Sequence, residues 1–209
     1  MLQCSLSQTV MILTESLPSL SGRILLVPPS DADDAPFAAL RGHPETRRFI
    51  PFAPAHTTPD EARERRLARE SNKAVIDFSI YAVTPGSPPK YVGAVGLLNI
   101  DEAFRFADSG LTVVPDLFRT GIATDALHAV FQYAFEERKL HRVVLHTGSM
   151  NFRMRGWLDR FGATLEGTLR DVWADGEGGY MDGCVYSILE YEWPTVKAKL
   201  EERINHVTG

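Results

Sequence analysis

The segment 111–126 combines residue types and spacing that could bind an anion at the start of a helix. A short apolar stretch leads into a loop, and from Gly121 the apolar residues recur at helical spacing. The first N–H groups of a helix lack intrahelical acceptors and lie at the positive end of the helix dipole. Gly121 has no side chain and Ala123 has nearly none, so a pyrophosphate could approach the backbone closely. Arg119 could add a charge-assisted contact to a phosphate.

The loop lacks the signatures of two common phosphate-binding motifs. No Gly-Lys-Ser/Thr follows it, as a Walker loop requires, and it lacks the spaced glycines of a dinucleotide fingerprint. The chain also contains neither a Gly-x-Ser-x-Gly elbow nor a His-Glu-x-x-His helix, so serine hydrolase and zinc protease chemistry are not supported. Taken alone, the loop also fits a purely structural turn, because glycine begins many helices for its turn geometry.

The order of periodic segments around this loop predicts a mixed α/β fold. Strands are expected at 24–27, 78–83, 91–100, 106–114, 143–145, 165–173 and 180–190. Helices are expected after Ser30, at 58–72, 121–139, 151–161 and 193–204. The helix at 58–72 begins with a capping box of Thr58 and Glu61. We therefore expect a mostly antiparallel central sheet flanked by helices, with one strand–helix–strand crossover near the middle.

The helix after Gly121 is expected to be amphipathic. Its apolar positions predict one buried face, made of Ile122, Ala126, Leu127, Val130, Phe131 and Ala134. Its polar positions, spaced by three and four, predict one solvated face, made of Asp125, His128, Gln132, Glu136 and Lys139.

The composition indicates a globular protein of the cytoplasm. A chain of 209 residues suits one domain with a substantial core. The net charge of -5, with basic residues interleaved among acids, disfavours nucleic-acid binding. No apolar run approaches the roughly 20 residues of a membrane span. Cys4 and Cys184 are too few for a disulfide framework and lack metal-ligand spacing, which favours a reducing location without a metal.

The chain is expected to divide into a tail, a domain and a closing helix. Residues 1–21 contain neither Lys nor Arg, which argues against a secretory signal or a mitochondrial presequence. Residues 22–194 form the domain, and residues 195–209 form a helix packed on that domain or on a partner subunit. His141 and His146 share one strand but lie five residues apart, so they should point to opposite faces and not form a paired ligand site.

Several motifs occur in the order of one known family. The stretches are Arg23–Pro28, His43–Phe52, Ala107–Gly110, Gly121–Ala126, Asn151–Met154 with Arg160–Gly162, and Asp182–Trp193. By these stretches the chain resembles the GNAT superfamily of N-acetyltransferases, in the branch that includes the ribosomal-protein N-terminal acetyltransferases. The resemblance covers roughly residues 22–194 and implies the acyl-CoA N-acyltransferase fold.

The resemblance implies a coenzyme A site between the central strand and the next one, which splay apart. Backbone groups of Thr112, Val113 and Val114 would pair with the pantetheine arm like an added strand. Asn151 would orient the end of the pantetheine and could also cap a helix. The pyrophosphate would accept hydrogen bonds from the N–H groups of Arg119, Thr120, Gly121, Ile122, Ala123 and Thr124. The chain departs from the family at two loop positions, with Phe118 in place of Gln or Arg and Arg119 in place of the first glycine.

The implied reaction is direct attack of an amine on the thioester of acetyl-coenzyme A. The amine must first lose a proton, and Asp108 matches the central-strand glutamate of the family. Glu102 is the second candidate base, and a surface carboxylate without a catalytic role is the alternative for both. A backbone N–H near Val113 or Val114 would stabilise the oxyanion.

The proton donor for the departing thiolate is left open. Leu158 and Met154 occupy the positions where the superfamily or the branch often has a donor, and neither can donate. Water, Tyr180 or Tyr186 are the remaining choices.

The sequence thus predicts an N-acetyltransferase, monomeric or homodimeric, that needs acetyl-coenzyme A as co-substrate. The alternatives are a non-catalytic acyl-CoA-binding or sensing domain and an α/β interaction module. The acceptor could be a protein N-terminus, a polyamine, an amino sugar or a small drug-like amine. The acidity of the chain favours a cationic acceptor. Four aromatic residues could line an acceptor pocket or belong to the core, namely Phe49, Phe52, Trp173 and Tyr180.

Overall fold

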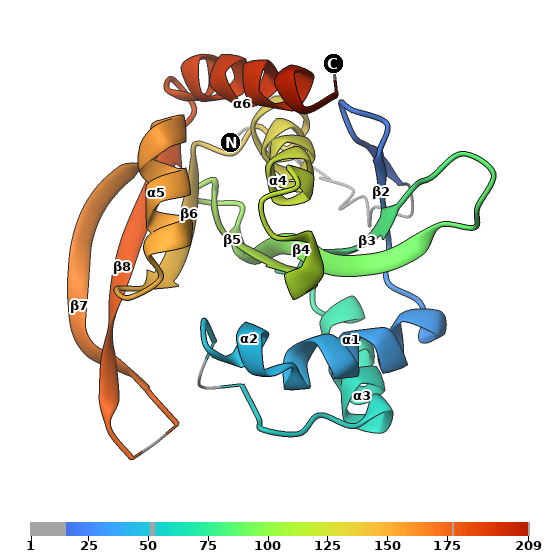
Figure 1. The fold of residues 1–209 in the computed structure, drawn as a ribbon. Coiled ribbons are helices and arrows are strands. Elements are labelled where there is room, and N and C mark those ends of the chain that lie inside the picture. Colours follow the sequence, from blue (N-terminus) through green and yellow to red (C-terminus); the bar gives the residue numbers. More distant parts are fainter. Residues whose placement is uncertain (1–15, 51–52, 177, 209) are drawn as a thin grey trace, which may run out of the picture.

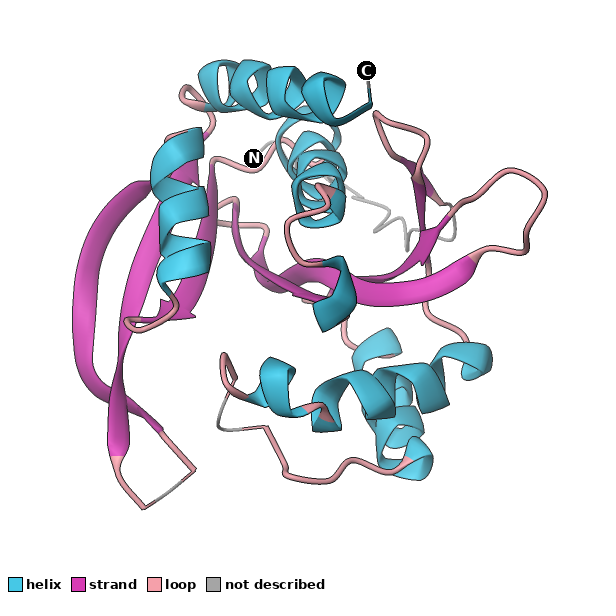
Figure 2. Ribbon diagram, viewed as in Figure 1, coloured by secondary structure: helices cyan, strands magenta, loops and turns pink. Residues whose placement is uncertain are grey.

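The computed structural model describes residues 16–50, 53–176 and 178–208, which form one eight-stranded sheet with helices on both faces (Figures 1 and 2). The strands are β1 (Leu17–Pro18), β2 (Ile24–Val27), β3 (Ile76–Ala82), β4 (Lys90–Asp101), β5 (Phe106–Val113), β6 (Arg142–Gly148), β7 (Thr164–Ala174) and β8 (Tyr180–Leu189). The helices are α1 (Asp34–Gly42), α2 (Pro44–Arg47), α3 (Pro59–Glu70), α4 (Ile122–Gln132), α5 (Phe152–Phe161) and α6 (Trp193–Thr208). Two 3-10 turns (Asp31–Asp33 and Pro115–Leu117) and a π-helical turn (Tyr133–Glu137) complete the elements. The mixed α/β fold predicted from the sequence is confirmed.

The sheet has the strand order β1-β2-β3-β4-β5-β6-β8-β7. Every neighbouring pair is antiparallel except β5 and β6, which are parallel and are connected by α4. A parallel pair needs a crossover connection, and α4 supplies it. The single strand–helix–strand crossover expected near the middle is therefore present.

The two strands of the parallel pair separate after a short contact. Their partners are Phe106 with Arg142, Ala107 with Val143 and Asp108 with Val144. Beyond Asp108, β5 continues to Val113 and β6 continues to Gly148 without further pairing. The sheet is thereby divided into two parts that open toward the viewer's lower left in Figure 1, with β7 and β8 on the outer side. Asp108 lies at the point where this opening begins.

Local sequence signals set several helix ends as expected. At the start of α3, Thr58 N–H donates to Glu61 Oε2 at 2.7 Å and Glu61 N–H donates to Thr58 Oγ1 at 3.2 Å, which completes the capping box. Gly162 ends α5 in the left-handed region at φ 95°. Helix α3 ends at Glu70, slightly before the expected end at residue 72.

Helix α4 differs from its expected amphipathic pattern. Asp125 is completely buried and His128 is 2% exposed, although both were predicted on the solvated face. Asp125 accepts hydrogen bonds from the backbone N–H and the hydroxyl of Ser21, and His128 Nε2 lies 3.4 Å from Glu201 of α6. The prediction was wrong because α6 and the turn before β2 cover this face (Figure 1).

The two ends of the described chain pack on the domain. Leu17 and Pro18 pair with β2, so part of the segment assigned to the tail belongs to the sheet. Residues 1–15, including Cys4, lie outside the described residues. Helix α6 packs on α4 through its buried apolar side chains, Trp193, Val196, Leu200 and Ile204. Within residues 16–50, 53–176 and 178–208, no helix is both long and apolar enough for a membrane span.

Candidate active site

The edge of β5 that faces the opening carries peptide groups without partners in the sheet. Val114 N–H donates to Val92 O of β4 at 2.9 Å. Successive peptide groups of an antiparallel strand alternate between its two sides. Leu111 and Val113 therefore direct their N–H and C=O groups into the opening, whereas those of Thr112 and Val114 face β4. Of the three residues expected to contact a pantetheine arm through their backbone, Val113 therefore faces the opening, whereas Thr112 and Val114 face β4.

The loop before α4 presents free N–H groups at the mouth of this opening. Arg119 and Gly121 have left-handed backbones, with φ of 66° and 90°. The first intrahelical bond runs from Asp125 N–H to Gly121 O at 3.0 Å. The N–H groups of residues 122–124 therefore form the free first turn of the helix. This is the local geometry expected for an anion-binding helix start.

Arg23 of the segment before β2 supports the loop. Its Nη1 donates to Thr120 O at 3.2 Å. A Cβ atom on Gly121 would lie 3.0 Å from Arg23 Nη2 and 3.4 Å from Val207 Cγ1. Glycine is thus favoured here by its φ, and a Cβ would press on the end of the Arg23 side chain. Thr120 is not a free donor, because its N–H and its hydroxyl both turn back to Leu117 O, at 3.4 and 2.7 Å.

Helix α5 forms the other side of the opening and is tied to the start of α4. Asn151 Oδ1 accepts from Met154 N–H at 3.1 Å, so the asparagine caps α5 as the sequence allowed. Trp157 Nε1 donates to Thr124 Oγ1 at 3.0 Å. This hydrogen bond fixes the first turn of α4 against α5 across the opened sheet.

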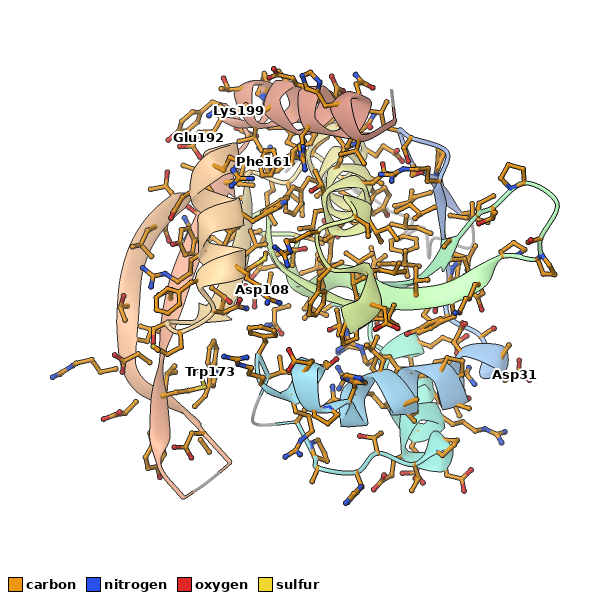
Figure 3. The ribbon with its side chains drawn as sticks, viewed as in Figure 1. Asp31, Asp108, Phe161, Trp173, Glu192 and Lys199 are labelled. Atoms are coloured by element: carbon orange, nitrogen blue, oxygen red, sulfur yellow. The ribbon has the colours of Figure 1, made fainter. Side chains whose placement is uncertain are left out.

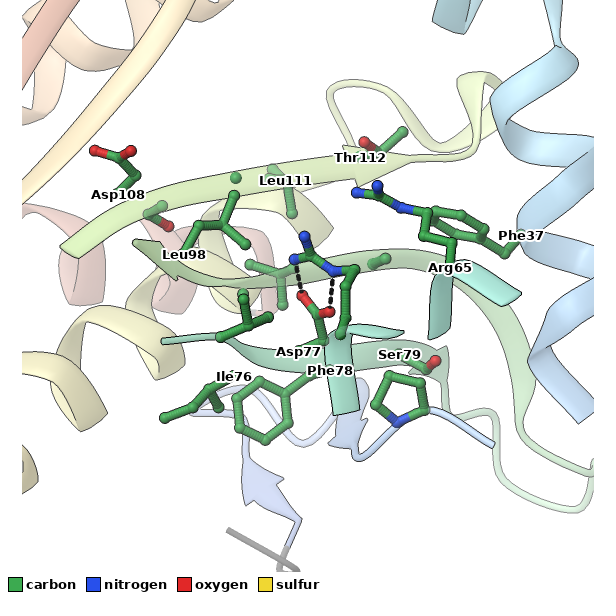
Figure 4. Close-up of a pocket in the computed structure, with 18 of the residues that line it drawn as sticks. Phe37, Arg65, Ile76, Asp77, Phe78, Ser79, Leu98, Asp108, Leu111 and Thr112 are labelled. Carbon is green, nitrogen blue, oxygen red and sulfur yellow. Dashed lines mark hydrogen bonds and ion pairs between the residues drawn. The ribbon is translucent and has the colours of Figure 1, made fainter. Parts of the chain in front are cut away.

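A cavity of about 840 Å³ lies on the face of the sheet opposite α4. Strands β4, β5 and β6 line one side of it and helices α1 and α3 line the other (Figure 4). Three of the expected site residues line it, namely Asp108, Thr112 and Asn151. Loop residues 119–124 are not among the residues that line it. Asp108 lies below the lower end of α5, above Trp173 of β7 (Figure 3).

Asp108 is held by two polar side chains at the head of the opening. Asn99 Nδ2 donates to its Oδ2 at 2.7 Å, and His146 Nε2 of β6 lies 3.7 Å from its Oδ1. Burial raises the pKa of Asp108, but the contacts with His146 and Asn99 and the charge of Arg142 outweigh it, so the net pKa is lowered. Asp108 is therefore an ionised carboxylate at neutral pH. Sequence reasoning missed both neighbours, because Asn99 and His146 reach Asp108 only through strand pairing.

Glu102 is not brought together with Asp108. It lies in the turn after β4, its side chain is 53% exposed, and it forms an ion pair with Arg138. It does not line the cavity, although Arg138 does. The second candidate base thus has an ion-pair partner and is not among the residues that line the cavity.

The candidate proton donors for a thiolate are also absent from the cavity wall. Tyr186 is completely buried, and Tyr180 is 69% exposed on β8. Neither lines the cavity, and Leu158 is buried in the core. Met154 lines the cavity and cannot donate. Among the residues that the structure describes, no group of three His, Cys, Asp or Glu could hold a metal ion.

The four aromatic candidates for an acceptor pocket separate into different places. Phe49 and Trp173 line the cavity, and Tyr180 does not. Phe52 lies outside the described residues. Tyr91, which was not singled out from the sequence, lines the cavity with a buried hydroxyl that has no hydrogen-bond partner among the described residues.

Comparisons with known proteins agree with this geometry. The family model described as "Acetyltransferase (GNAT) domain" matches residues 23–164. A protein of Bacillus subtilis (strain 168), "Putative ribosomal N-acetyltransferase YdaF", is 26% identical over 175 residues, which cover 81% of this chain and 92% of that protein.

Two solved structures share the fold. One is a spermidine N-acetyltransferase from Vibrio cholerae in complex with CoA and spermine, with a TM-score of 0.73, 20% identity, and coverage of 82% of this chain and 98% of that one. The other is RimL, a ribosomal L7/L12 alpha-N-protein acetyltransferase in complex with coenzyme A, with a TM-score of 0.73, 16% identity, and coverage of 84% and 98%.

Proposed function

The chain belongs to the GNAT acetyltransferase family and is an N-acetyltransferase, and we propose that it transfers the acetyl group of acetyl-coenzyme A directly to a primary amine in a ternary complex. The observation that carries this proposal is the opening between β5 and β6, which has free peptide groups along one edge and a helix start at its mouth. The donor enters from the side of α4 and α5. The acceptor enters through the cavity on the opposite face.

The residues present fit the co-substrate. The peptide groups of Leu111 and Val113 can pair with the amides of the pantetheine arm, as an added strand would. The N–H groups of Arg119 and of residues 122–124 can donate to the pyrophosphate, and the dipole of α4 favours its negative charge. Asn151 lies at the N-terminus of α5, beside the inner end of the opening.

Amine deprotonation is the step that the cavity must assist. An alkyl amine with a pKa near 10.4 loses its proton at pH 7 at a cost of roughly 4 to 5 kcal/mol. We propose that Asp108 and His146 together receive this proton, directly or through water, with the ionised Asp108 stabilising the charge on the imidazole. The amine nitrogen then attacks the thioester carbonyl carbon. The N–H of Val113 faces the opening and can stabilise the oxyanion, whereas that of Val114 is donated to Val92.

Collapse of the intermediate breaks the C–S bond and releases the coenzyme A thiolate. Met154 and Leu158 cannot donate a proton, and we propose that water protonates the thiolate. The lack of a donor at positions 154 and 158 is also the observation that favours the second candidate function, a non-catalytic acyl-CoA-binding or sensing domain.

A thiol-release assay separates the two functions. The purified chain is incubated with acetyl-coenzyme A and a panel of amines, and free thiol is measured over time. We expect turnover with at least one amine, and we expect Asp108→Asn to lower kcat while acetyl-coenzyme A binding in a calorimeter stays unchanged. Calorimetric binding without thiol release for any amine would assign the sensing function. Wild-type turnover of Asp108→Asn from pH 6 to 9 would remove Asp108 from the mechanism.

A further inference from the structure

The wall of the cavity formed by α1 and α3 is rich in arginine. Four arginines line it, Arg41 from α1 and Arg65, Arg66 and Arg69 from α3. Arg66 forms a two-pronged ion pair with Asp34, at 2.8 and 2.9 Å. Arg69 forms a second such pair with Asp77, at 2.5 and 2.6 Å, which is drawn with dashed lines in Figure 4. Two of the four guanidinium groups are therefore neutralised by carboxylates that also line the cavity, Asp34 of α1 and Asp77 of β3.

Arg41 and Arg65 have no such partner among the described residues. Arg41 lies over the ring of Phe37, with its guanidinium carbon 5.9 Å from the ring centre. Figure 4 shows Arg65 beside Phe37, with its guanidinium extended toward the side of the cavity that holds Thr112. Arg65 remains exposed within the open cavity, so a ligand can reach it.

The remaining carboxylates of the cavity are engaged elsewhere. Asp33 accepts from the hydroxyl of Tyr81 and from Ser30 N–H, and Asp108 is held by Asn99 and His146. The remaining acid, Glu70, is 68% exposed and lies 3.9 Å from Arg66. The surplus charge at this end of the cavity is thus positive.

Burial and neighbouring positive charge act against the charged forms of both arginines. Desolvation and the charge of Arg69 lower the pKa of Arg41; desolvation and the charges of Arg69 and Arg41 lower the pKa of Arg65, and the charge of Asp77 offsets this only in part. An arginine stays protonated in a protein, so both groups keep their charge. A ligand anion would relieve this repulsion, and the planar forks of two guanidinium groups match a carboxylate or a phosphate.

We propose that Arg41 and Arg65 bind an anionic group, a carboxylate or a phosphate, on the amine acceptor. The proposal rests on the proposed acetyl transfer and names its substrate class. It replaces the expectation of a cationic acceptor, because net charge acts at long range whereas these arginines act inside the cavity. Asp108 and Thr112 lie four positions apart on β5, about 13 Å of extended strand, and the guanidinium of Arg65 extends toward the Thr112 end (Figure 4). The acceptor is therefore an elongated molecule with an amine at one end and an acid toward the other.

Matched acceptors test the substrate class. We would measure kcat and KM for ω-amino carboxylates of graded length, for ω-aminoalkyl phosphates, and for alkylamines and diamines of the same lengths. The wild type should prefer one of the two acid-tailed series over the neutral-tailed and cation-tailed series by about tenfold or more in kcat/KM. The preferred series identifies the anion as carboxylate or phosphate. Equal or better turnover of the neutral or cationic series overturns the proposal and leaves the acetyl transfer intact.

Single substitutions test the residues. Arg65→Gln and Arg41→Gln should raise KM for the acid-tailed amine about tenfold or more, with little change in kcat or in the KM for the neutral analogue. Arg63→Gln is the matched control, because Arg63 is exposed on the same helix and does not line the cavity. Arg65→Glu should reverse the preference toward diamines, a change that a merely structural role would not produce.

Two further outcomes are informative. A rise in the KM for acetyl-coenzyme A in Arg65→Gln, with no change for the acceptor, would assign the arginines to the phosphates of the donor and would overturn the proposal. If no amine supports thiol release, the acetyl transfer itself fails. Calorimetry with the acid-tailed amine then tests the anion site by itself. Binding by the wild type that is lost in both Gln variants supports the site. Equal binding by the wild type and the two variants refutes it.

Discussion

Substitution of Gly121 by alanine changes the backbone of the loop before α4. This loop is proposed to bind the pyrophosphate of acetyl-coenzyme A. The residue has φ 90°, where an L side chain costs about 1 to 2 kcal/mol. Its new Cβ would lie 3.0 Å from Arg23 Nη2, and displacing Arg23 would weaken the hydrogen bond to Thr120 O, a further ~1 kcal/mol. We expect the free energy of unfolding in urea to fall by about 2 to 3 kcal/mol.

The same substitution should weaken the binding of acetyl-coenzyme A. A change in the backbone at the helix start misaligns the N–H groups of residues 122–124, and a lost hydrogen bond to a charged group is worth about 1.5 to 3 kcal/mol. The dissociation constant, measured by calorimetry, should therefore rise roughly 10-fold to 100-fold.

Gly162→Ala is the matched control for this experiment. Gly162 also has a left-handed backbone, at φ 95°, and its Cβ would lie 3.2 Å from Lys199 Nζ at the far end of α5. This variant should lose a similar amount of stability and keep the wild-type affinity for acetyl-coenzyme A. Equal affinities of the two variants for acetyl-coenzyme A would refute the assignment of the loop to the pyrophosphate, whatever their stabilities.

Two other predictions concern the packing around the site. Asp34→Asn should lower the free energy of unfolding by about 1 to 2 kcal/mol at pH 7, because Asp34 is paired with Arg66 and its pKa is lowered by that hydrogen bond. The stabilisation by Asp34 is present above the ordinary pKa of aspartate and is lost as the pH falls through the lower pKa of the folded state. Urea titrations of the variant and the wild type should therefore converge only in strong acid. A constant difference in unfolding free energy at all pH values would contradict this linkage. Trp157→Phe removes the donor to Thr124 and should cost about 1 kcal/mol; in a double-mutant cycle with Thr124→Val, strictly additive losses would show that this hydrogen bond does not couple α4 to α5.

Sequence alone was sufficient for features that depend on a few consecutive residues. The capping box of Thr58 and Glu61, the glycine ends at Gly121 and Gly162, and the cap at Asn151 all follow from local hydrogen bonding and backbone conformation. Such rules act within one turn of the chain, so the positions of most elements and the presence of one strand–helix–strand crossover could be anticipated.

Strand pairing decided which backbone groups are free. The sequence placed Val113 and Val114 equally well beside the pantetheine, since both follow the same apolar run. Only the hydrogen bond from Val114 to Val92 shows which of the two faces the opening. A shift of one residue in register would exchange their roles, and no local signal fixes that register.

Contacts between distant segments decided which charged residues meet at the site and which residues of α4 are buried. Asp125 and His128 have the spacing of a solvated face, but Ser21 and α6 cover them. His146 approaches Asp108 because β6 pairs in parallel with β5, and Arg41 and Arg65 share one cavity because α1 packs on α3. Hydrophobic periodicity indicates which residues of one element lie on the same side. Which other segments cover that side depends on the whole fold.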